Sequence, residues 1–132
     1  FCINVKDIEK SLEFWEGVCE LPLHHRTEIP GVLEAVLQAH EGGSRIQLAQ
    51  HLDNTEPIDM GTAMWKLYVN TSDCKRLYKR AIEAGCESVM EPEELERWPV
   101  TVAFVKDFDG YLIEFVEHHE GTRAGVPDPK KS

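Results

Sequence analysis

The sequence predicts an α+β fold made of two βαβββ modules, whose sheets form a cupped, incomplete eight-stranded barrel with the helices outside. The order strand, helix, three strands occurs twice along the 132 residues. The segment 45–51, RIQLAQH, also matches 112–118, LIEFVEH, at a constant offset of 67 residues. A repeat of this kind indicates two copies of one supersecondary unit. We expect a first module at 1–51, a linker at 52–63, a second module at 64–119 and a polar tail at 120–132.

The first module begins with a strand at 1–5 and continues with a helix at roughly 8–18. Asp7 is placed to cap this helix, because its carboxylate accepts hydrogen bonds from the unpaired N–H groups of the first turn. Leu12 and Trp15 lie at helical spacing on one apolar face. Pro-Gly and Glu-Gly-Gly turns separate the strands that follow. We expect these strands at 23–29, 33–40 and 44–51.

The second module repeats this order. A strand at 65–70 is followed by a helix at 73–84, and Gly85 stands where a left-handed, helix-ending residue belongs. Further strands are expected at 86–90, 100–106 and 111–117, with a loop at 91–98 and a tight turn at 107–110.

Composition narrows the range of functions. With 24 acidic and 14 basic residues the chain carries a net charge of −10, which disfavours nucleic acid and anionic membranes as partners. The apolar runs are too short to span a bilayer, and no secretory signal is visible. The four cysteines lack metal-binding spacing, which favours reduced, packed thiols. We therefore expect a cytoplasmic protein.

Two segments resemble the vicinal oxygen chelate superfamily, which includes glyoxalase I, extradiol dioxygenases and bleomycin-resistance proteins. The opening VKDIEKSLEFW, at 5–15, is similar to the family motif V-x-D-x-x-x-S-x-x-F-Y. The segment FVKDFDGYLIEF, at 104–115, is similar to the ending D-P-D-G-x-x-I-E-L, with Phe108 in place of the proline. The resemblance covers nearly the whole chain. The family's helix-ending glycine falls at Glu20 of this sequence, where a non-glycine residue in a left-handed conformation costs about 1 kcal/mol. It implies the paired βαβββ fold, a small-molecule ligand and a homodimer.

Strand alternation assigns the two faces of the first and the last strand of each module. One face is apolar and is expected to lie under the helices. The other mixes polar and apolar groups, as a pocket that orients a small ligand does, and the repeat would close two such faces toward each other. The alternative is a sheet face that simply meets water. Our substrate-binding candidates are Asn4, Arg45, Gln47, Lys66, Tyr68, Trp98 and His118. Trp98 is either a lid over this pocket or ordinary packing.

The resemblance also implies a candidate metal site. Family members that bind a divalent ion use one position on the first strand and one on the last strand of each module, usually His and then Glu or Gln. The last-strand positions here are Gln47 and Glu114, both competent oxygen ligands. Glu114 has a structural alternative, which is to face water or to pair with Lys66 or Arg45. Without a metal, Glu114 is our candidate general base, or an anchor for a cationic ligand.

The first-strand positions are less favourable for a metal. Aligning the first strands by Val5 and Val69, at an offset of 64, places the position of the second module at Met64. A thioether is a poor ligand for Zn²⁺, Ni²⁺, Mn²⁺ or Fe²⁺. The position of the first module falls immediately before Phe1. Because the chain opens in mid-strand without an initiator Met, we expect residues upstream, and a metal site then requires a His among them.

Two functions of different classes follow. The first is a metal-free small-molecule-binding protein that resembles the bleomycin-resistance proteins, with an incomplete metal site. The alternative is a lyase, isomerase or dioxygenase of glyoxalase type that holds substrate oxygens on one divalent ion. Met64 favours the first, and Gln47 with Glu114 favours the second, so whether the protein is an enzyme stays open. The pair His24 and His25 occupies adjacent strand positions, so we expect the two rings on opposite faces, unable to chelate together.

Overall fold

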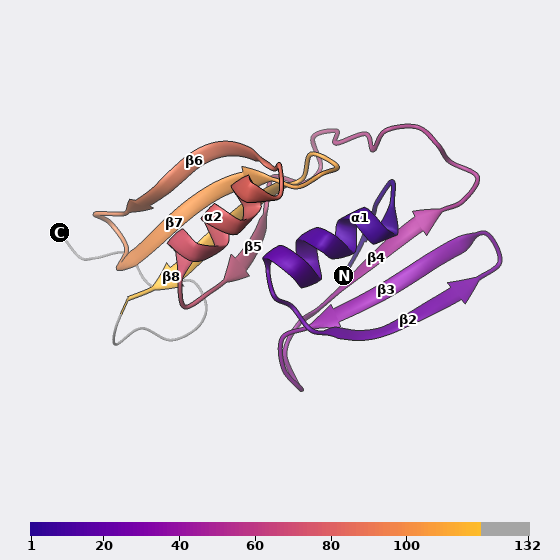
Figure 1. The fold of residues 1–132 in the computed structure, drawn as a ribbon, viewed down its shortest axis with the longest axis horizontal. Coiled ribbons are helices and arrows are strands. Elements are labelled where there is room, and N and C mark those ends of the chain that lie inside the picture. Colours follow the sequence, from indigo (N-terminus) through magenta and orange to yellow (C-terminus); the bar gives the residue numbers. More distant parts are fainter. Residues whose placement is uncertain (120–132) are drawn as a thin grey trace. The chain divides into compact units, whose positions relative to one another are not determined.

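The computed structural model describes residues 1–119, so the predicted tail at 120–132 lies outside the described residues. The described chain divides into two compact units, one made of 1–61 with 108–110 and the other of 62–107 with 111–119. Each unit carries one four-stranded sheet and one helical segment, in the order strand, helix, three strands (Figure 1). The predicted α+β fold of two βαβββ modules is confirmed. We call them module 1 and module 2 in chain order.

Module 1 contains a mixed sheet in the order β1-β4-β3-β2, with β1 parallel to β4 and the other neighbours antiparallel. Its elements are β1 (Cys2–Asn4), α1 (Ile8–Leu12), the π-helical η1 (Glu13–Val18), β2 (Leu23–Ile29), β3 (Val32–Gln38) and β4 (Arg45–His51). Helix α1 lies over β3 and β4 (Figure 1). Ile8, Phe14 and Trp15 are almost fully buried and form the core between the helical segment and the sheet.

Both ends of the first helical segment follow from the sequence. The side chain of Asp7 accepts hydrogen bonds from the backbone N–H groups of Glu9, at 3.0 Å, and Lys10, at 3.3 Å, as predicted for a capping residue. Beyond the other end, Glu20 adopts a φ of 60°, the left-handed conformation that its position predicts. The local sequence therefore determines where this segment begins and ends.

The turn at 108–110 belongs to the same compact unit as α1. Asp109 accepts hydrogen bonds from the backbone N–H of Lys6 at 3.2 Å and from the hydroxyl of Ser11 at 3.3 Å. Phe108 meets the ring of Phe14 edge to face, with centroids 6.4 Å apart. Burial raises the pKa of the Asp109 carboxyl, although both hydrogen bonds act in the opposite direction. A turn distant in sequence thus completes the start of the first helix.

Module 2 contains a sheet in the order β5-β8-β7-β6, again with its first and last strands parallel. Its elements are β5 (Leu67–Asn70), α2 (Cys74–Glu83), β6 (Glu87–Glu94), β7 (Val100–Lys106) and β8 (Leu112–His118). Helix α2 lies over β6, β7 and β8 (Figure 1). Asp73 caps the helix by accepting from the backbone N–H of Arg76 at 3.0 Å, and Gly85 ends it with the predicted positive φ, 97°.

Strand β6 departs from the expected boundaries. It extends to Glu94 and takes up half of the loop predicted at 91–98. The extension includes Pro92, and proline cannot donate to a strand ladder. The strand β6 is an edge strand, however, and its pairing with β7 is interrupted by irregularities on both sides of Met90. An edge strand with bulges tolerates proline, which explains the difference.

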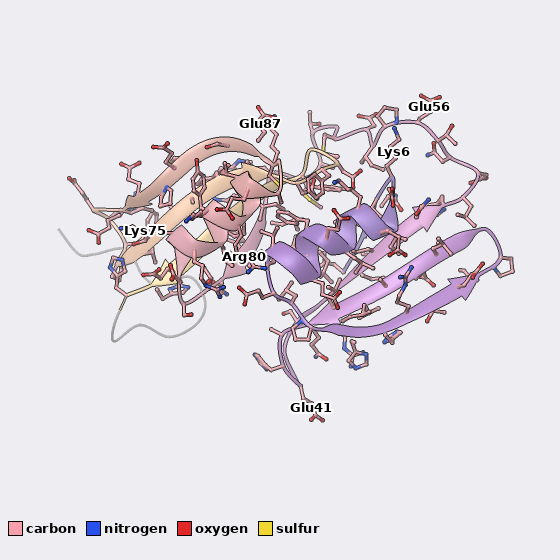
Figure 2. The ribbon with its side chains drawn as sticks, in the orientation of Figure 1. Lys6, Glu41, Glu56, Lys75, Arg80 and Glu87 are labelled. Atoms are coloured by element: carbon pink, nitrogen blue, oxygen red, sulfur yellow. The ribbon has the colours of Figure 1, made fainter. Side chains whose placement is uncertain are left out.

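Charged side chains lie on the surface of both modules, and the cysteines are free thiols, as the composition predicts. Glu41 and Glu56 project from module 1, and Lys75 and Glu87 project from module 2 (Figure 2). All four cysteines are free thiols, and burial raises the pKa of Cys74 to about 12, so this thiol stays protonated at neutral pH. Within residues 1–119, no helix has the length and apolar character needed to cross a membrane.

The strand pairing changes the expected alignment of the two modules. Cys2 lies opposite Gln47 in module 1, and Tyr68 lies opposite Glu114 in module 2. Gln47 and Glu114 are equivalent at an offset of 67 (114 − 47), so Cys2 and Tyr68 are equivalent at an offset of 66 (68 − 2). The offset of 64 predicted for the first strands is therefore wrong by two residues.

This correction reassigns the first-strand position of module 2. The residue equivalent to the position immediately before Phe1 is Lys66, directly before β5, and not Met64. Met64 precedes the strand by three residues and is 43% exposed. The chemistry of this position is consequently that of an ammonium group rather than a thioether.

Candidate functional site

The helix-free face of the module 2 sheet, opposite α2, is hollowed. The hollow measures about 670 Å³, a size typical of small-molecule sites. Its walls come from all four strands, the segment before β5 and the loop between β6 and β7. The lining residues are Trp65, Lys66, Tyr68, Asn70, Met90, Leu95, Trp98, Val100, Val102, Phe104, Glu114 and Val116. All of them belong to module 2.

Strand β7 explains why this face is so apolar. Val102 and Phe104 line the hollow, whereas Ala103 and Val105 point the other way, toward α2, and are fully buried. The strand is therefore apolar on both faces, as a strand covered on both sides is. An apolar face without a covering helix provides a surface for an apolar ligand.

An ion pair lies among these apolar side chains. The Nζ of Lys66 is 2.6 Å from Oε1 of Glu114, and the two side chains are only 11% and 9% exposed. Burial by itself would lower the pKa of Lys66, but the contacts with Glu114 and with the hydroxyl of Tyr68 outweigh it, so the pKa is raised. Lys66 therefore stays positively charged at neutral pH. The structure matches the alternative in which Glu114 pairs with Lys66.

Aromatic rings surround the same ammonium group. Nζ of Lys66 lies 4.0 Å from the ring centroid of Trp65, 4.8 Å from that of Tyr68 and 5.3 Å from that of Phe104. The negative face of an aromatic ring attracts a cation, and more strongly where water is excluded. Three rings and one carboxylate thus hold the ammonium in place.

The other end of this sheet face carries a polar pair that both modules repeat. His118 Nε2 lies 3.2 Å from Oδ1 of Asn70, and His51 Nε2 lies 3.0 Å from Oδ1 of Asn4 in module 1. The Nδ1 of His118 is buried without a hydrogen-bond partner among the described residues. Trp98 packs against the buried cluster of Val100, Val102 and Val116. Of its two predicted roles, packing along the wall of the hollow is the one that these contacts support.

The helix-free face of module 1 is more polar. Gln47 donates a side-chain hydrogen bond to the carboxylate of Glu34, and Arg45 lies 3.4 Å from Nε2 of His24. The expectation for the two histidines is wrong, because Nδ1 of His24 and Nδ1 of His25 are only 2.6 Å apart. A register irregularity between Leu23 and His25 interrupts the strand alternation there and lets both rings meet.

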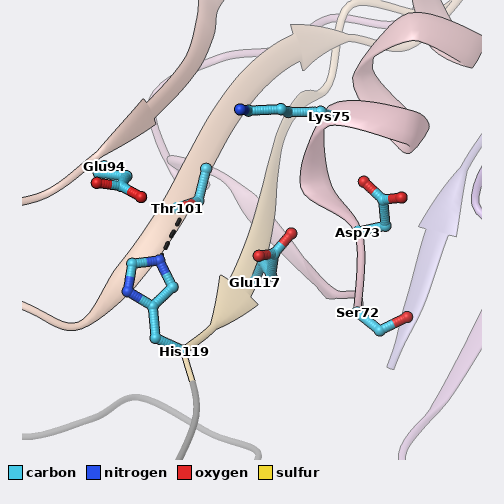
Figure 3. Close-up of a pocket in the computed structure, with 7 residues that line it drawn as sticks. All are labelled: Ser72, Asp73, Lys75, Glu94, Thr101, Glu117 and His119. Atoms are coloured by element: carbon cyan, nitrogen blue, oxygen red, sulfur yellow. Dashed lines mark hydrogen bonds between the residues drawn. The ribbon is translucent and has the colours of Figure 1, made fainter.

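A second hollow, of about 390 Å³, lies at the start of α2 (Figure 3). Oγ1 of Thr101 and Nε2 of His119 are 2.9 Å apart, and Glu117 accepts from the backbone N–H of Cys74 at 2.8 Å. These groups stabilise the helix start and the end of β8. The walls are polar and offer little apolar surface to an organic ligand, so we take the hollow beside Lys66 as the candidate site.

Comparison with known proteins decides the family. The sequence profile of the Glyoxalase/Bleomycin resistance protein/Dioxygenase superfamily matches residues 1–115 of this chain. The chain belongs to this superfamily. The resemblance inferred from the two motifs is thereby confirmed.

Two similar proteins are named as lactoylglutathione lyases or probable ones. The lactoylglutathione lyase of Neisseria meningitidis is 30% identical over 122 residues, which cover 90% of this chain and 88% of the relative. A probable lactoylglutathione lyase of Synechocystis is 25% identical over 118 residues, covering 87% and 90% of the two chains.

Solved structures agree on the fold. Glyoxalase I from Zea mays matches with a TM-score of 0.79 at 20% identity, covering 97% of this chain but only 45% of the maize chain. This chain thus spans less than half the length of that protein. A glyoxylase/bleomycin resistance protein/dioxygenase domain from Frankia sp. matches with a TM-score of 0.71 at 20% identity, over 92% and 90% of the two chains.

The superfamily resemblance implies a divalent ion, and the residues at the corresponding strand positions decide whether one fits. At the first-strand position of module 2 stands Lys66, and an ammonium group donates hydrogen bonds but has no lone pair for a metal. Its charge, 2.6 Å from Glu114, also repels a cation placed at that carboxylate. Gln47 is bonded to Glu34. Within residues 1–119 no three His, Cys, Asp or Glu side chains are grouped to hold a metal. As arranged, these residues do not fit a divalent ion at Glu114.

The predicted site residues fall into two groups. Lys66, Tyr68, Trp98 and Glu114 line the hollow of module 2, and His118 lies on the same sheet face. Asn4, Arg45 and Gln47 lie on the helix-free face of module 1. The lining residues that the sequence did not single out are Trp65, Asn70, Met90, Leu95, Val100, Val102 and Phe104. The double-sided apolar pattern of β7 was the available signal for Val102 and Phe104, but faces were assigned only to the first and last strands.

Proposed function

We propose that this protein binds an apolar small molecule on the helix-free face of module 2, without a metal ion. The observation that carries the proposal is the apolar hollow of about 670 Å³ with one buried ion pair, Lys66 and Glu114, in its wall. Sites for small organic ligands have this composition, with mostly apolar walls and few polar groups to orient the ligand. The proposal makes the protein a binding member of its superfamily.

Dye binding tests the proposal. Nile red, an uncharged dye that fluoresces in apolar surroundings, should bind the wild type, and a chelator should leave the signal unchanged. Val102→Arg places a charge inside the hollow and should abolish binding. Val89→Arg is the matched control, because Val89 lies on β6 outside the hollow and is 50% exposed.

A folding check accompanies this comparison, because Val102 is buried. Circular dichroism shows whether Val102→Arg keeps its secondary structure. Tyr68→Ala supplies a second variant, since Tyr68 lines the hollow but is 55% exposed, and it should weaken binding with the fold intact. Equal dye binding by the wild type and both hollow variants would overturn the proposal.

The lyase activity of the relatives is the second candidate. It is favoured by the 30% identity to the lactoylglutathione lyase of Neisseria meningitidis. The corresponding assay follows the thioester absorbance of lactoylglutathione with Zn²⁺, Ni²⁺, Mn²⁺ or Fe²⁺ added separately. Turnover that Glu114→Gln abolishes would replace the binding proposal by this one. No turnover with any of the four ions would leave binding as the function.

Two further expectations belong to the proposal. The resemblance implies a homodimer, which light scattering during size-exclusion chromatography measures. The cytoplasmic location inferred from composition is supported by the free state of all four cysteines. Reduced thiols in protein isolated under thiol-blocking conditions would agree with that location.

A further inference from the structure

We propose that the hollow of module 2 selects an uncharged molecule with an apolar body and one carbonyl oxygen, and that this oxygen accepts a hydrogen bond from Nζ of Lys66. This inference rests on the proposed binding function and names its ligand class. The observations behind it are the position of Lys66 in the wall, the charge balance of the hollow and the nature of its remaining walls.

Lys66 has the donor that such an oxygen needs. An ammonium group carries three N–H donors, and the contacts with Glu114 and Tyr68 engage at most two of them. The rings of Trp65 and Phe104 attract the charge but accept no strong hydrogen bond. Because the side chain is 11% exposed and held on several sides, the ammonium group is already oriented before a ligand arrives.

The charge balance favours an uncharged ligand. Lys66 and Glu114 are the two charged residues in the hollow's lining and cancel each other. An anion would have to compete with Glu114 for Lys66, and a cation would have to displace Lys66 from its rings and its carboxylate. Either ion would enter apolar surroundings without a counter-charge of its own, which is costly. A carbonyl oxygen accepts from Lys66 and leaves the ion pair intact.

The remaining walls favour a ring-bearing or branched apolar body. Trp65, Tyr68, Trp98 and Phe104 offer aromatic surfaces, and Val102 with its neighbours forms the floor. Aromatic side chains bury large apolar areas and stack against flat groups. The carbonyl and the apolar body together therefore match the two parts of the hollow.

Four naphthalenes of matched size distinguish the possibilities. Acetylnaphthalene carries the carbonyl, isopropylnaphthalene replaces its oxygen by a methyl group, naphthoate carries a negative charge and aminoethylnaphthalene carries a positive one. Isothermal titration calorimetry measures their affinities for the full chain. Because a hydrogen bond to a charged donor is strong, acetylnaphthalene should bind about tenfold more tightly than isopropylnaphthalene. Both charged probes should bind more weakly than acetylnaphthalene.

Substitutions of the ion pair test whether Lys66 donates the hydrogen bond to the ligand. In Lys66→Met/Glu114→Leu both members of the ion pair become apolar, which avoids leaving one buried charge alone. The preference for acetylnaphthalene over isopropylnaphthalene should vanish in this variant. The matched control is Lys106→Met/Glu87→Leu, which removes a pair 3.9 Å apart between β6 and β7, outside the lining of the hollow. The control should keep the tenfold preference.

The outcomes separate the two proposals. Equal binding of acetylnaphthalene and isopropylnaphthalene to the wild type would overturn the role of Lys66 and leave the binding function standing. Tighter binding of either charged probe would overturn the selection for uncharged ligands. A preference that persists in Lys66→Met/Glu114→Leu would assign the donor elsewhere. If none of the four probes binds, the proposed binding function fails as well.

Discussion

The ammonium nitrogen of Lys66 lies 2.6 Å from a carboxylate oxygen of Glu114 on a sheet face whose other lining side chains carry no charge. Glu114 is the residue that the superfamily resemblance assigned to a metal ion. Here its charge is balanced by a side chain of the same module. Removing two charges from water is costly. The short Lys66–Glu114 contact and the three aromatic rings around the ammonium group offset part of that cost.

Breaking this pair from one side should destabilise the protein. Glu114→Gln leaves Lys66 buried without its counter-charge, so we expect the free energy of unfolding to fall by about 3–5 kcal/mol. Lys66→Met/Glu114→Leu removes both charges and should stay close to the wild type. Urea unfolding followed by circular dichroism measures both. A Glu114→Gln variant as stable as the wild type would show that the pair carries no net coupling.

The raised pKa of Lys66 predicts how this contribution depends on pH. A lysine whose pKa is raised in the folded state stabilises the fold fully below its unfolded value of 10.5, and the contribution is lost as the pH rises through the higher folded value. The difference in unfolding free energy between the wild type and Lys66→Met should therefore be constant from neutral pH to the onset of lysine titration and shrink above it. A difference that instead shrinks near neutral pH would contradict a raised pKa.

Asp109 should show a dependence of the same sign, but in the acid range. Its pKa is raised, mainly by burial, so the folded state prefers the protonated carboxyl, and stability is lost as the pH rises from 3.8 through the folded pKa. Relative to Asp109→Asn, which keeps an acceptor without the charge, the wild type should gain thermal stability as the pH falls from neutral toward that range. Melting temperatures of the two proteins across this pH range provide the measurement.

Comparing Asp109→Ala with Asp109→Asn separates the effect of losing the hydrogen-bond acceptor from the effect of losing the charge. This variant leaves the backbone N–H of Lys6 and the hydroxyl of Ser11 without their Asp109 acceptor, and about 1–2 kcal/mol of stability should be lost. Asp109→Asn should lose less at neutral pH. Equal losses in the two variants would mean that the hydrogen bonds to Asp109 contribute nothing.

The ends of the two helical segments give a paired test of backbone strain. Glu20 has a φ of 60°, so Glu20→Gly should raise the unfolding free energy by about 1 kcal/mol. Gly85 has a φ of 97°, and a Cβ there would meet no atom within 4 Å, so Gly85→Ala should lower stability by a similar amount through backbone strain alone. Thermal unfolding of both variants decides whether the signs are opposite.

Much of the fold could be predicted because its signals are local. The carboxylate of Asp7 marked a helix start, Gly85 marked a helix end, and the internal match at an offset of 67 indicated two equivalent modules. Each signal acts within a few residues or compares two segments directly, so it needs no knowledge of tertiary contacts.

The bulges in the edge strands could not be predicted in the same way. The irregularity beside His25 turned two rings toward each other, and those around Met90 carried β6 past Pro92. A bulge depends on how one strand pairs with its neighbour, and that pairing is a tertiary property.

The pairing of Lys66 with Glu114 separates what the sequence determined from what only the tertiary structure decided. The period of two along each strand determined by itself which residues share a face, and Lys66, Tyr68 and Glu114 were placed together for that reason. A shift of two residues preserves this alternation, so the period could not distinguish an offset of 64 from one of 66. Only the hydrogen-bonded register of β5 against β8 placed Lys66, rather than Met64, at the first-strand position. Register depends on contacts between strands distant in sequence, and those contacts form only when the module folds.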